Sequence, residues 1–243
     1  MIQLEQGDCL KLLPHVPDKS VNLILCDLPY GMTNNEFDKV IPFDALWAQY
    51  KRVLADKGVI ALFGIEPFAS KLRMSNLKMY KYDWIWYKHN VGNFLNAKKM
   101  PLRNTERICV FANKNATYNP IMWKGKMQVK GCGTNSNAGG NYGSTFVCLR
   151  KKNDIYYPRE ILDFKAVASN KRFHPTEKPV PLLEYLIKTY TYEGDTVLDN
   201  CMGSGSTGVA CVNLNRNFIG MELTPKFYDI AFERINDAMR EKV

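Results

Sequence analysis

Two apolar runs, far apart in the sequence, each end at an aspartate that opens a loop. Residues 21–26 run into Asp27-Leu28-Pro29-Tyr30, and residues 196–198 run into Asp199-Asn200-Cys201-Met202-Gly203-Ser204-Gly205. Such runs are typical of strands that are buried on both faces of a parallel sheet. In open α/β sheets, ligands bind beyond the carboxyl ends of the strands. We therefore interpret the second loop as a cofactor site and the first as the place of the chemistry.

Strand-like and helix-like segments alternate along most of the chain. Short apolar runs predict further strands at 2–4, 59–63, 80–87, 108–112 and 217–221, and helical spacing predicts helices at 10–16, 43–54, 66–77, 180–190, 206–214 and from 225 onwards. This alternation predicts an α/β fold with a mostly parallel central sheet and helices on both faces.

The periodicity fades between residues 115 and 170, and Gly, Asn, Lys and Ser dominate positions 131–144. We expect this stretch to be a loop-rich insertion that is mobile when unbound. The sequence has no internal repeat and no clear linker. Residues 1–243 are therefore expected to form one domain that includes the 115–170 insertion.

The composition argues against several classes of protein. No run of about 18 apolar residues is present, so we expect no membrane span. The first residues lack the basic and apolar segments of a signal peptide. The seven cysteines include no Cys-x-x-Cys pair, which argues against a zinc site, and their odd number favours reduced thiols. A cytoplasmic protein is expected.

The net charge of +9 is unevenly distributed. Residues 71–178 hold 21 Lys and Arg against 6 Asp and Glu, whereas the rest of the chain holds 12 against 18. A basic middle within an acidic frame indicates a region that binds a polyanion. The alternative is a solvated basic surface that serves solubility.

The loop after Asp199 continues as Gly203-Ser204-Gly205-Ser206-Thr207-Gly208, which matches the pattern G-x-G-x-x-G. Glu222 lies 19 residues after Gly203, near the spacing of an acid that binds a ribose. Glycines let the backbone approach a ligand closely. The pattern therefore predicts a nucleoside-containing cofactor, and the alternative is a tight strand-to-helix turn.

A nicotinamide cofactor is the first candidate, but two features oppose it. Only 44 residues follow Asp199, too few for the second half of a dinucleotide fold. The Asp199 carboxylate also stands where a pyrophosphate would approach. S-adenosylmethionine has a cationic sulfonium, an amino group and a ribose but no phosphate, so it suits Asp199 and Glu222 better.

Three segments follow one another in the chain: Asp27-Leu28-Pro29-Tyr30, His174-Pro175-Thr176-Glu177-Lys178-Pro179, and residues 199–205. They resemble the Asp-Pro-Pro-Tyr motif, the His-Pro-x-x-Lys-Pro segment and the Asp-Pro-Phe-x-Gly-x-Gly cofactor motif of amino-group DNA methyltransferases. Their order is similar to that of the beta class. The resemblance covers almost the whole chain and is weakest at 115–170. It implies a Rossmann-like, S-adenosylmethionine-dependent methyltransferase fold with an inserted target-recognition region.

The resemblance also implies roles for individual residues. The catalytic residues would be Asp27, Leu28, Pro29 and Tyr30, acting on an adenine flipped out of a duplex. The cofactor contacts would be Asp8, Cys9, Asp27, His174, Thr176, Lys178, Asp199, Cys201, Met202, Gly203, Ser204, Gly205 and Glu222. Two of these have structural alternatives: Asp8 as a helix cap and His174 as a satisfied loop histidine.

Several positions depart from the family's motifs. Leu28 replaces the first proline, so another part of the protein must stiffen this loop. Asn200-Cys201 replaces Pro-Phe, and Cys201 is smaller than the aromatic residue that packs on the cofactor adenine in the family. Asn104 stands where related enzymes often have His. These changes put the cofactor affinity and the loop conformation in question.

The basic middle suits a duplex. Basic side chains can contact phosphates, and Arg and Asn can also contact base edges. The DNA-binding candidates are Asn93, Lys98, Lys99, Arg103, Arg107, Arg150, Lys151 and Lys152. Residues 115–170 would read the target sequence.

The sequence thus predicts a DNA methyltransferase of a restriction-modification type that moves a methyl group from S-adenosylmethionine to adenine N6. An Asp at position 27 usually accompanies adenine in this family. The alternatives are a cytosine N4 enzyme, a methyltransferase of RNA or a small polar substrate, and a non-catalytic nucleic-acid-binding module. The partner is double-stranded DNA, and a homodimer is one arrangement that the sequence leaves open.

Overall fold

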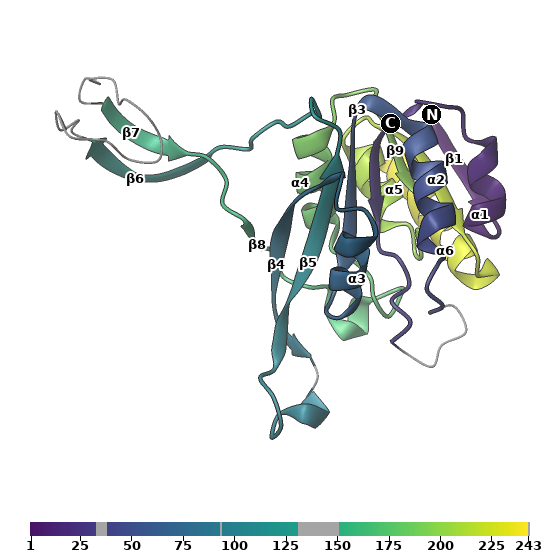
Figure 1. The fold of residues 1–243 in the computed structure, drawn as a ribbon, viewed down its shortest axis with the longest axis horizontal. Coiled ribbons are helices and arrows are strands. Elements are labelled where there is room, and N and C mark those ends of the chain that lie inside the picture. Colours follow the sequence, from purple (N-terminus) through teal and green to yellow (C-terminus); the bar gives the residue numbers. More distant parts are fainter. Residues whose placement is uncertain (33–37, 93, 131–150, 243) are drawn as a thin grey trace. The chain divides into compact units, whose positions relative to one another are not determined.

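The computed structural model describes residues 1–32, 38–92, 94–130 and 151–242. It contains an eight-stranded sheet with the order β1-β10-β9-β2-β3-β5-β4-β8 (Figure 1). The strands span Ile2–Gln6 (β1), Val21–Cys26 (β2), Leu54–Gly64 (β3), Tyr80–Gly92 (β4), Arg103–Ala112 (β5), Ile161–Asp163 (β8), Thr196–Asp199 (β9) and Asn217–Glu222 (β10). Neighbouring strands are parallel except where β5 pairs with β3 and β4. The predicted α/β fold with a mostly parallel sheet is confirmed.

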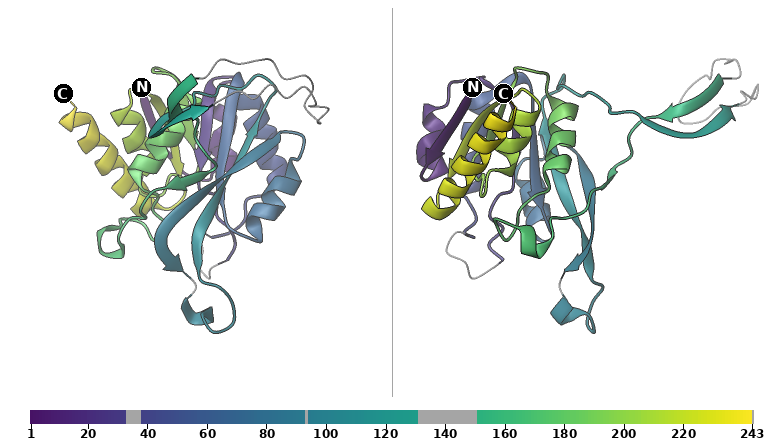
Figure 2. Two further views of the ribbon diagram at one scale, coloured as in Figure 1. Left: turned by 90° about the vertical axis from the view of Figure 1, so that its left-hand side faces the viewer. Right: turned by 180° about the vertical axis from the view of Figure 1, so that it is seen from behind.

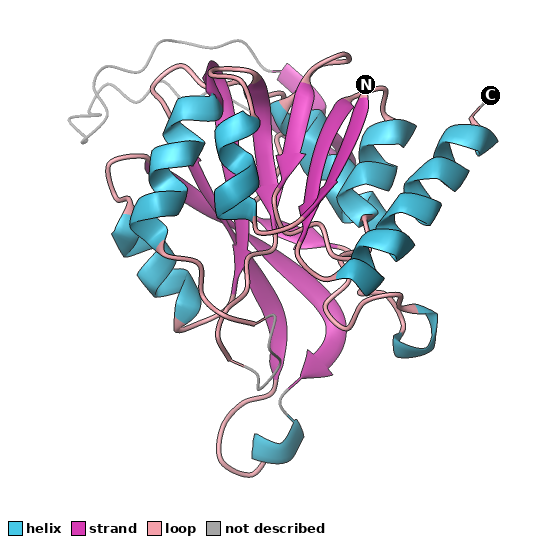
Figure 3. Cartoon of the chain, turned by 90° about the vertical axis from the view of Figure 1, so that its right-hand side faces the viewer, coloured by secondary structure: helices cyan, strands magenta, loops and turns pink. Residues whose placement is uncertain are grey.

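Helices cover both faces of this sheet (Figure 3). The helices are α1 (Cys9–Leu12), α2 (Phe43–Val53), α3 (Phe68–Ser75), α4 (Val180–Tyr190), α5 (Ser206–Asn213) and α6 (Pro225–Glu241). Side chains of α1, α2 and α3 share one buried cluster, and those of α4, α5 and α6 share the other. In β2, Leu23 and Leu25 face the second cluster, whereas Ile24 and Cys26 face the first. Because successive side chains of a strand point to opposite faces, the buried part of β2, residues 23–26, must be apolar on both faces.

Three strands are longer than the sequence predicts by about five residues or more. β3 starts at Leu54 rather than at 59, because Leu54 is buried and pairs with Val21 of β2. β4 extends to Gly92 and β5 starts at Arg103, where these two residues pair across the hairpin. The extensions are polar, so apolar runs alone miss them.

The described chain forms two compact units, Met1–Asn119 with Glu160–Val243, and Pro120–Arg159. The second unit is an antiparallel ribbon of β6 (Trp123–Lys130) and β7 (Lys151–Tyr156), seen from two sides in Figure 2. The rings of Trp123 and Tyr156 pack on each other at a tilt of 31°, with their centroids 5.0 Å apart. The expectation of a loop-rich insertion is therefore wrong for these two strands, whose polar sequences hide their regularity, and for β8, which is only three residues long. The glycine-rich part, 131–144, lies outside the described residues.

Three short 3₁₀ helices complete the described chain: η1 (Leu13–His15), η2 (Phe94–Asn96) and η3 (Ser169–Lys171). Within the described residues, no helix is both long and apolar enough to cross a membrane. Across the same residues, no group of His, Cys, Asp or Glu side chains is arranged to hold a metal ion.

Candidate active site

The two aspartate loops meet at the carboxyl ends of neighbouring strands. β2 and β9 are parallel partners, with Ile24 opposite Leu198. The loops that begin at Asp27 and Asp199 therefore leave the sheet at the same edge, where α/β proteins bind their ligands. A cavity of about 820 Å³ lies there. The predicted site residues that line it are Asp8, Cys9, Asp27, Leu28, Pro29, Tyr30, His174, Thr176, Lys178, Asp199, Cys201, Met202, Gly203, Ser204 and Glu222.

Two buried carboxylates shape the glycine loop. Glu222 accepts hydrogen bonds from the main-chain N–H groups of Gly203 at 2.9 Å and Thr224 at 2.8 Å. Asp199 accepts from the Cys201 N–H at 3.1 Å and the Thr207 hydroxyl at 2.6 Å. Each carboxylate oxygen can accept a second hydrogen bond, so both groups can still contact a ligand. Burial raises the pKa of Asp199 to about 6, while the bond from Thr207 opposes this shift.

Gly203 and Gly205 have different environments. Both adopt left-handed conformations, with φ of +52° and +80°. A Cβ on Gly203 would meet the His174 ring at 3.6 Å, an ordinary contact beside the cavity. A Cβ on Gly205 would lie 2.9 Å from the Ala231 backbone of α6. A glycine at position 205 is therefore required for packing against α6, and its predicted contact with the cofactor stays a prediction.

Asp8 lies directly before α1, and Cys9 is the first residue of that helix. The Asp8 carboxylate accepts the Leu10 N–H at 2.9 Å and so caps α1, as the alternative interpretation expected. Both residues also line the cavity. A hydrogen bond with Cys201, together with burial, raises the pKa of the Cys9 thiol, so it stays protonated at neutral pH.

His174 lies against the glycine loop. Its ring packs edge-on against Phe227, with centroids 4.2 Å apart, and its Nδ1 lies 3.1 Å from the Thr176 hydroxyl. Burial, together with the nearby Lys178 ammonium, lowers the pKa of His174 to about 4. His174 is therefore a neutral side chain at physiological pH, with contacts inside the protein as well as a face on the cavity.

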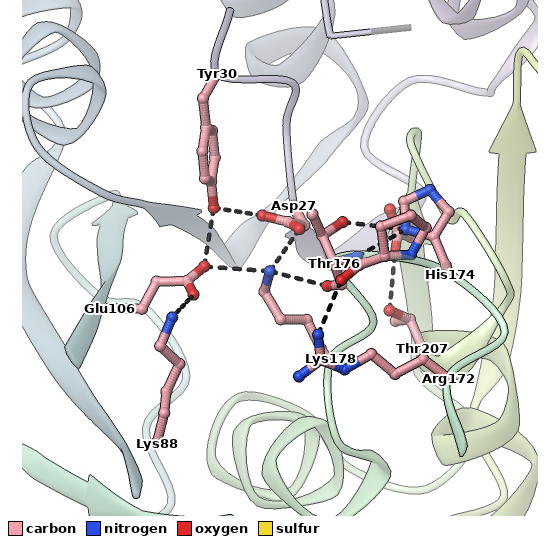
Figure 4. Close-up of polar contacts among 11 residues, drawn as sticks. Asp27, Tyr30, Lys88, Glu106, Arg172, His174, Thr176, Lys178 and Thr207 are labelled. Carbon is pink, nitrogen blue, oxygen red and sulfur yellow. Dashed lines mark hydrogen bonds and ion pairs between the residues drawn. The ribbon is translucent and has the colours of Figure 1, made fainter. Parts of the chain in front are cut away.

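A cluster of buried charges surrounds Asp27 (Figure 4). The Lys178 ammonium lies 2.5 Å from Asp27 Oδ2 and 3.1 Å from Glu106 Oε1. The Tyr30 hydroxyl lies 2.5 Å from Asp27 Oδ1 and 2.9 Å from the same Glu106 oxygen. Lys88 reaches Glu106 Oε2 at 3.2 Å. Two carboxylates and two ammonium groups thus balance in charge.

The pKa shifts of these groups follow from burial and their partners. Burial raises the pKa of Asp27, attraction to Lys178 opposes this, and repulsion from Glu106 adds to it. Burial also acts against ionised Glu106, but Lys178 and Lys88 outweigh it and hold the Glu106 pKa below its usual value. Burial raises the pKa of Tyr30, so its hydroxyl keeps its proton. Asp27 is consequently a better proton acceptor than an exposed aspartate.

Sequence reasoning missed Glu106 and Lys88. Glu106 lies in β5, in a section that has no apolar run, and it pairs with Trp86 of β4. Lys88 lies two residues after Trp86 on the same strand. The available signal was an acidic residue two positions before the start of the apolar run at 108–112. Lys178 lines the cavity and pairs with Asp27 and Glu106, and its predicted contact with the cofactor stays a prediction.

The structure separates the predicted DNA-binding residues. Arg103 lines the cavity, and Lys98 and Lys99 lie exposed in the connection between β4 and β5. Arg107 instead pairs with Asp83 at 3.2 Å and Glu66 at 3.4 Å. Lys151 and Lys152 begin β7 in the ribbon. Asn93 and Arg150 lie outside the described residues.

Comparison with known proteins gives consistent matches. A family model described as DNA methylase matches residues 21–233. The type II methyltransferase M.HinfI of Haemophilus influenzae is 30% identical over 96% of this chain and 67% of its own. The type II methyltransferase M2.MboI of Moraxella bovis is 27% identical over 96% of this chain and 86% of its own.

Two solved structures share the fold. The M1.HpyAVI-SAM complex has a TM-score of 0.66 and 24% identity, with 97% of this chain and 100% of that chain covered. The cytosine-N4-specific PvuII DNA methyltransferase has a TM-score of 0.67 and 16% identity, with 99% and 92% covered.

Proposed function

This chain belongs to the DNA methylase family, and we propose that it transfers a methyl group from S-adenosylmethionine to the N6 amine of an adenine flipped out of duplex DNA. The observation that carries this proposal is a single cavity with two chemically different ends. Among the residues that line it, we call those of the Asp27 loop the first end, and Asp199, Glu222 and the glycine loop the second end. A methyl donor and an amine can therefore meet inside one cavity.

The second end fits the proposed cofactor. Asp199 and Glu222 are acidic, whereas a phosphate-containing cofactor would be repelled there. The left-handed Gly203 keeps the loop close to the cavity. Glu222 retains lone pairs for ribose hydroxyls after binding two N–H groups. When bound, S-adenosylmethionine supplies a methyl group made electrophilic by its sulfonium.

The first end would prepare the amine. The lone pair of an exocyclic amine is delocalised into the ring, which makes the nitrogen a weak nucleophile. If the Asp27 carboxylate and the Leu28 carbonyl accept its two hydrogens, the lone pair localises on the nitrogen. In-line attack forms the N–C bond, breaks the S–C bond and leaves the electron pair on sulfur. The pocket's contribution is mainly positioning, and Asp27 accepts the released proton.

Tyr30 would hold the flipped base. Its ring packs on Phe68, with centroids 4.8 Å apart, and its hydroxyl bonds to Asp27. These contacts supply stiffness that the family's first proline would provide at position 28. A purine gives Tyr30 more stacking area than a pyrimidine, which supports adenine over cytosine.

The exposed lysines support a duplex partner. In the β6–β7 ribbon, Lys124, Lys126 and Lys152 are exposed. Lys98 and Lys99 are exposed beside the strand end that carries Arg103. We propose that the ribbon reads the target sequence and that these cations contact phosphates.

The deciding experiment is transfer of a tritiated methyl group to DNA and to RNA, followed by digestion and identification of the nucleoside by mass. N6-methyladenine in DNA is the expected product. N4-methylcytosine would overturn the choice of base, and labelled RNA alone would overturn the choice of substrate. If no methyl group is transferred and calorimetry detects no binding of S-adenosylmethionine, the result would favour a non-catalytic nucleic-acid-binding module.

Three further predictions concern the location of the protein, its biological role and its oligomeric state. We propose that the protein is a cytoplasmic enzyme of a restriction-modification system and that it methylates the DNA of the cell, which protects this DNA from cleavage. Digestion of methylated and unmethylated DNA with extracts of the source cells tests this role. The homodimer stays a prediction, and sedimentation of the protein with and without a duplex tests it.

A further inference from the structure

Lys178 lies between the half-buried carboxylate of Asp27 and the buried carboxylate of Glu106. Its ammonium donates to Asp27 Oδ2 at 2.5 Å and to the Thr176 carbonyl at 3.3 Å, and it lies 3.1 Å from Glu106 Oε1. The ammonium also lies 4.9 Å from the centre of the Phe63 ring, and Lys178 is 8% exposed. Since a lysine has three N–H donors, this arrangement is saturated.

This arrangement engages both oxygens of Asp27. Oδ2 accepts from Lys178 and Oδ1 accepts from the Tyr30 hydroxyl. Each Asp27 oxygen keeps one lone pair, so a substrate amine that donates to Asp27 must share an oxygen with one of these two groups. The ammonium is the stronger competitor because a charged donor binds a carboxylate more tightly than a neutral amine does.

Glu106 offers both competitors another acceptor. Its Oε1 already lies 3.1 Å from the Lys178 nitrogen and 2.9 Å from the Tyr30 oxygen. A small movement toward Glu106 would release Asp27 without leaving a buried donor unpaired, which is otherwise costly. Lys88 lies 3.2 Å from the other Glu106 oxygen and keeps this carboxylate in place.

Resting on the proposed function, we infer that Glu106 is a positioning residue for base entry. When the target amine arrives, Glu106 accepts the hydrogen bonds of Lys178 and Tyr30. The Asp27 oxygens therefore bind these two side chains in the empty pocket and the amine in the substrate complex. Lys178 acts as an internal occupant of the position that the amine later takes. Glu106 itself acts through these two side chains, not on the reacting atoms.

The test is a double-mutant cycle of Glu106→Gln and Lys178→Met, in which the measured quantity is the entry of the target base into the pocket. The duplex probe carries 2-aminopurine at the position where the wild-type enzyme methylates, and its fluorescence rises when the base leaves the stack. In Glu106→Gln, Lys178 stays on Asp27, so base entry and kcat fall roughly tenfold or more, the cost of a charged hydrogen bond. Affinity for the duplex and for S-adenosylmethionine stays unchanged.

The cycle separates this role from a structural one. If Glu106 acts through Lys178, the two changes are not additive. In the Lys178→Met background, Glu106→Gln should therefore alter base entry by less than roughly twofold. An unchanged tenfold effect in the Lys178→Met background overturns the inference. Lys178→Arg is the second variant if Lys178→Met does not fold. The arginine guanidinium can make two hydrogen bonds to Asp27, so base entry should fall below the wild-type level. Base entry at or above the wild-type level in this variant overturns the inference too.

Glu193→Gln serves as the matched control. Glu193 is exposed in the turn before β9, at the end of that strand opposite the cavity. It should leave every readout at the wild-type level. Absence of methylation by the wild-type enzyme contradicts the proposed function itself, whereas normal methylation with an additive cycle contradicts only the role of Glu106.

Discussion

Lys178 places its ammonium nitrogen 2.5 Å from Oδ2 of Asp27, although 151 residues separate the two in the chain. The contact joins the loop after β2 to the segment that leads into α4. It balances the charge of a carboxylate that burial would otherwise drive toward protonation. The catalytic motif therefore depends on a residue from a different motif.

Replacement of Asp27 should separate chemistry from cofactor binding. Asp27→Asn keeps the shape but removes the charge and the proton acceptor, so methyl transfer should fall by roughly 10²- to 10⁴-fold. Tritiated-methyl transfer measures the rate, and calorimetry with S-adenosylmethionine measures the affinity, which should change little. Tyr30→Phe keeps the ring and should cost much less. An Asp27→Asn enzyme at full rate would overturn the mechanism.

Glu222 should contribute to cofactor affinity and to the loop that forms the site. Glu222→Ala removes the acceptor for Gly203 and Thr224 as well as the contact with the ribose. We expect S-adenosylmethionine binding to weaken by about 1–3 kcal/mol, measured by calorimetry. Glu222→Gln retains one acceptor oxygen and should lose less. Equal affinity of the folded alanine variant and the wild type would remove Glu222 from the site.

The two loop glycines should respond differently to alanine. At Gly205, left-handed backbone and a contact at 2.9 Å with Ala231 combine, so the free energy of unfolding should fall by about 2–4 kcal/mol. At Gly203, only the backbone conformation opposes a side chain, and the expected loss is about 1–2 kcal/mol. Urea unfolding of both variants measures the difference. The prediction fails if Gly203→Ala is the less stable variant.

Asp199 should make the empty protein less stable as the pH rises. Its pKa is about 6 in the folded chain against a usual 3.8. The folded state therefore retains a proton that the unfolded state loses between these values, so stability falls as the pH passes through this window. Asp199→Asn lacks this titration. It should match the wild type near pH 4 and exceed it by up to about 3 kcal/mol at pH 8.

Urea unfolding between pH 4 and pH 8, without cofactor, measures this difference. His174 provides the control, because its lowered pKa of about 4 gives the opposite slope. His174→Gln should reduce the loss of stability on acidification below pH 6.5. Parallel stability curves for Asp199→Asn and the wild type would contradict the assigned pKa.

The basic ribbon should contribute to the salt dependence of duplex binding. Replacement of Lys124, Lys126 and Lys152 by Gln should make the slope of log K against log salt shallower by about 2–3, because each phosphate contact contributes about 0.9. Fluorescence anisotropy with a labelled duplex at several salt concentrations measures this slope.

The matched control changes three exposed lysines of the acidic frame, Lys11, Lys51 and Lys57, to Gln. It removes the same net charge and should leave the slope almost unchanged. Equal effects of the two triple variants would show that only the overall charge matters, against a binding role for the ribbon.

The sequence predicted the central sheet well because of how it is buried. β2 and β9 are covered on both faces, so their residues form continuous apolar runs that end at Asp27 and Asp199. Helix limits were signalled by Pro179 and Pro225, which stand at helix starts. These are local signals, and a single sequence records them directly.

Other features depend on tertiary contacts. Glu106 reaches the site through the register of β4 against β5, which the sequence alone does not state. Gly205 fits the glycine pattern of a ligand loop, yet Ala231, 26 residues further along the chain, explains it. The β6–β7 ribbon buries few apolar side chains, so its strands lack the alternation that predicts them.

The continuity of the 820 Å³ cavity has a pharmacological consequence. A bisubstrate inhibitor, with an adenosine unit joined through a short tether to a second purine, could occupy both ends at once. Once one half is bound, the other half binds as an intramolecular event, at an effective concentration set by the tether. Such a molecule would discriminate against proteins that share only the adenosine-binding half, because they lack the Asp27 end that captures the second purine.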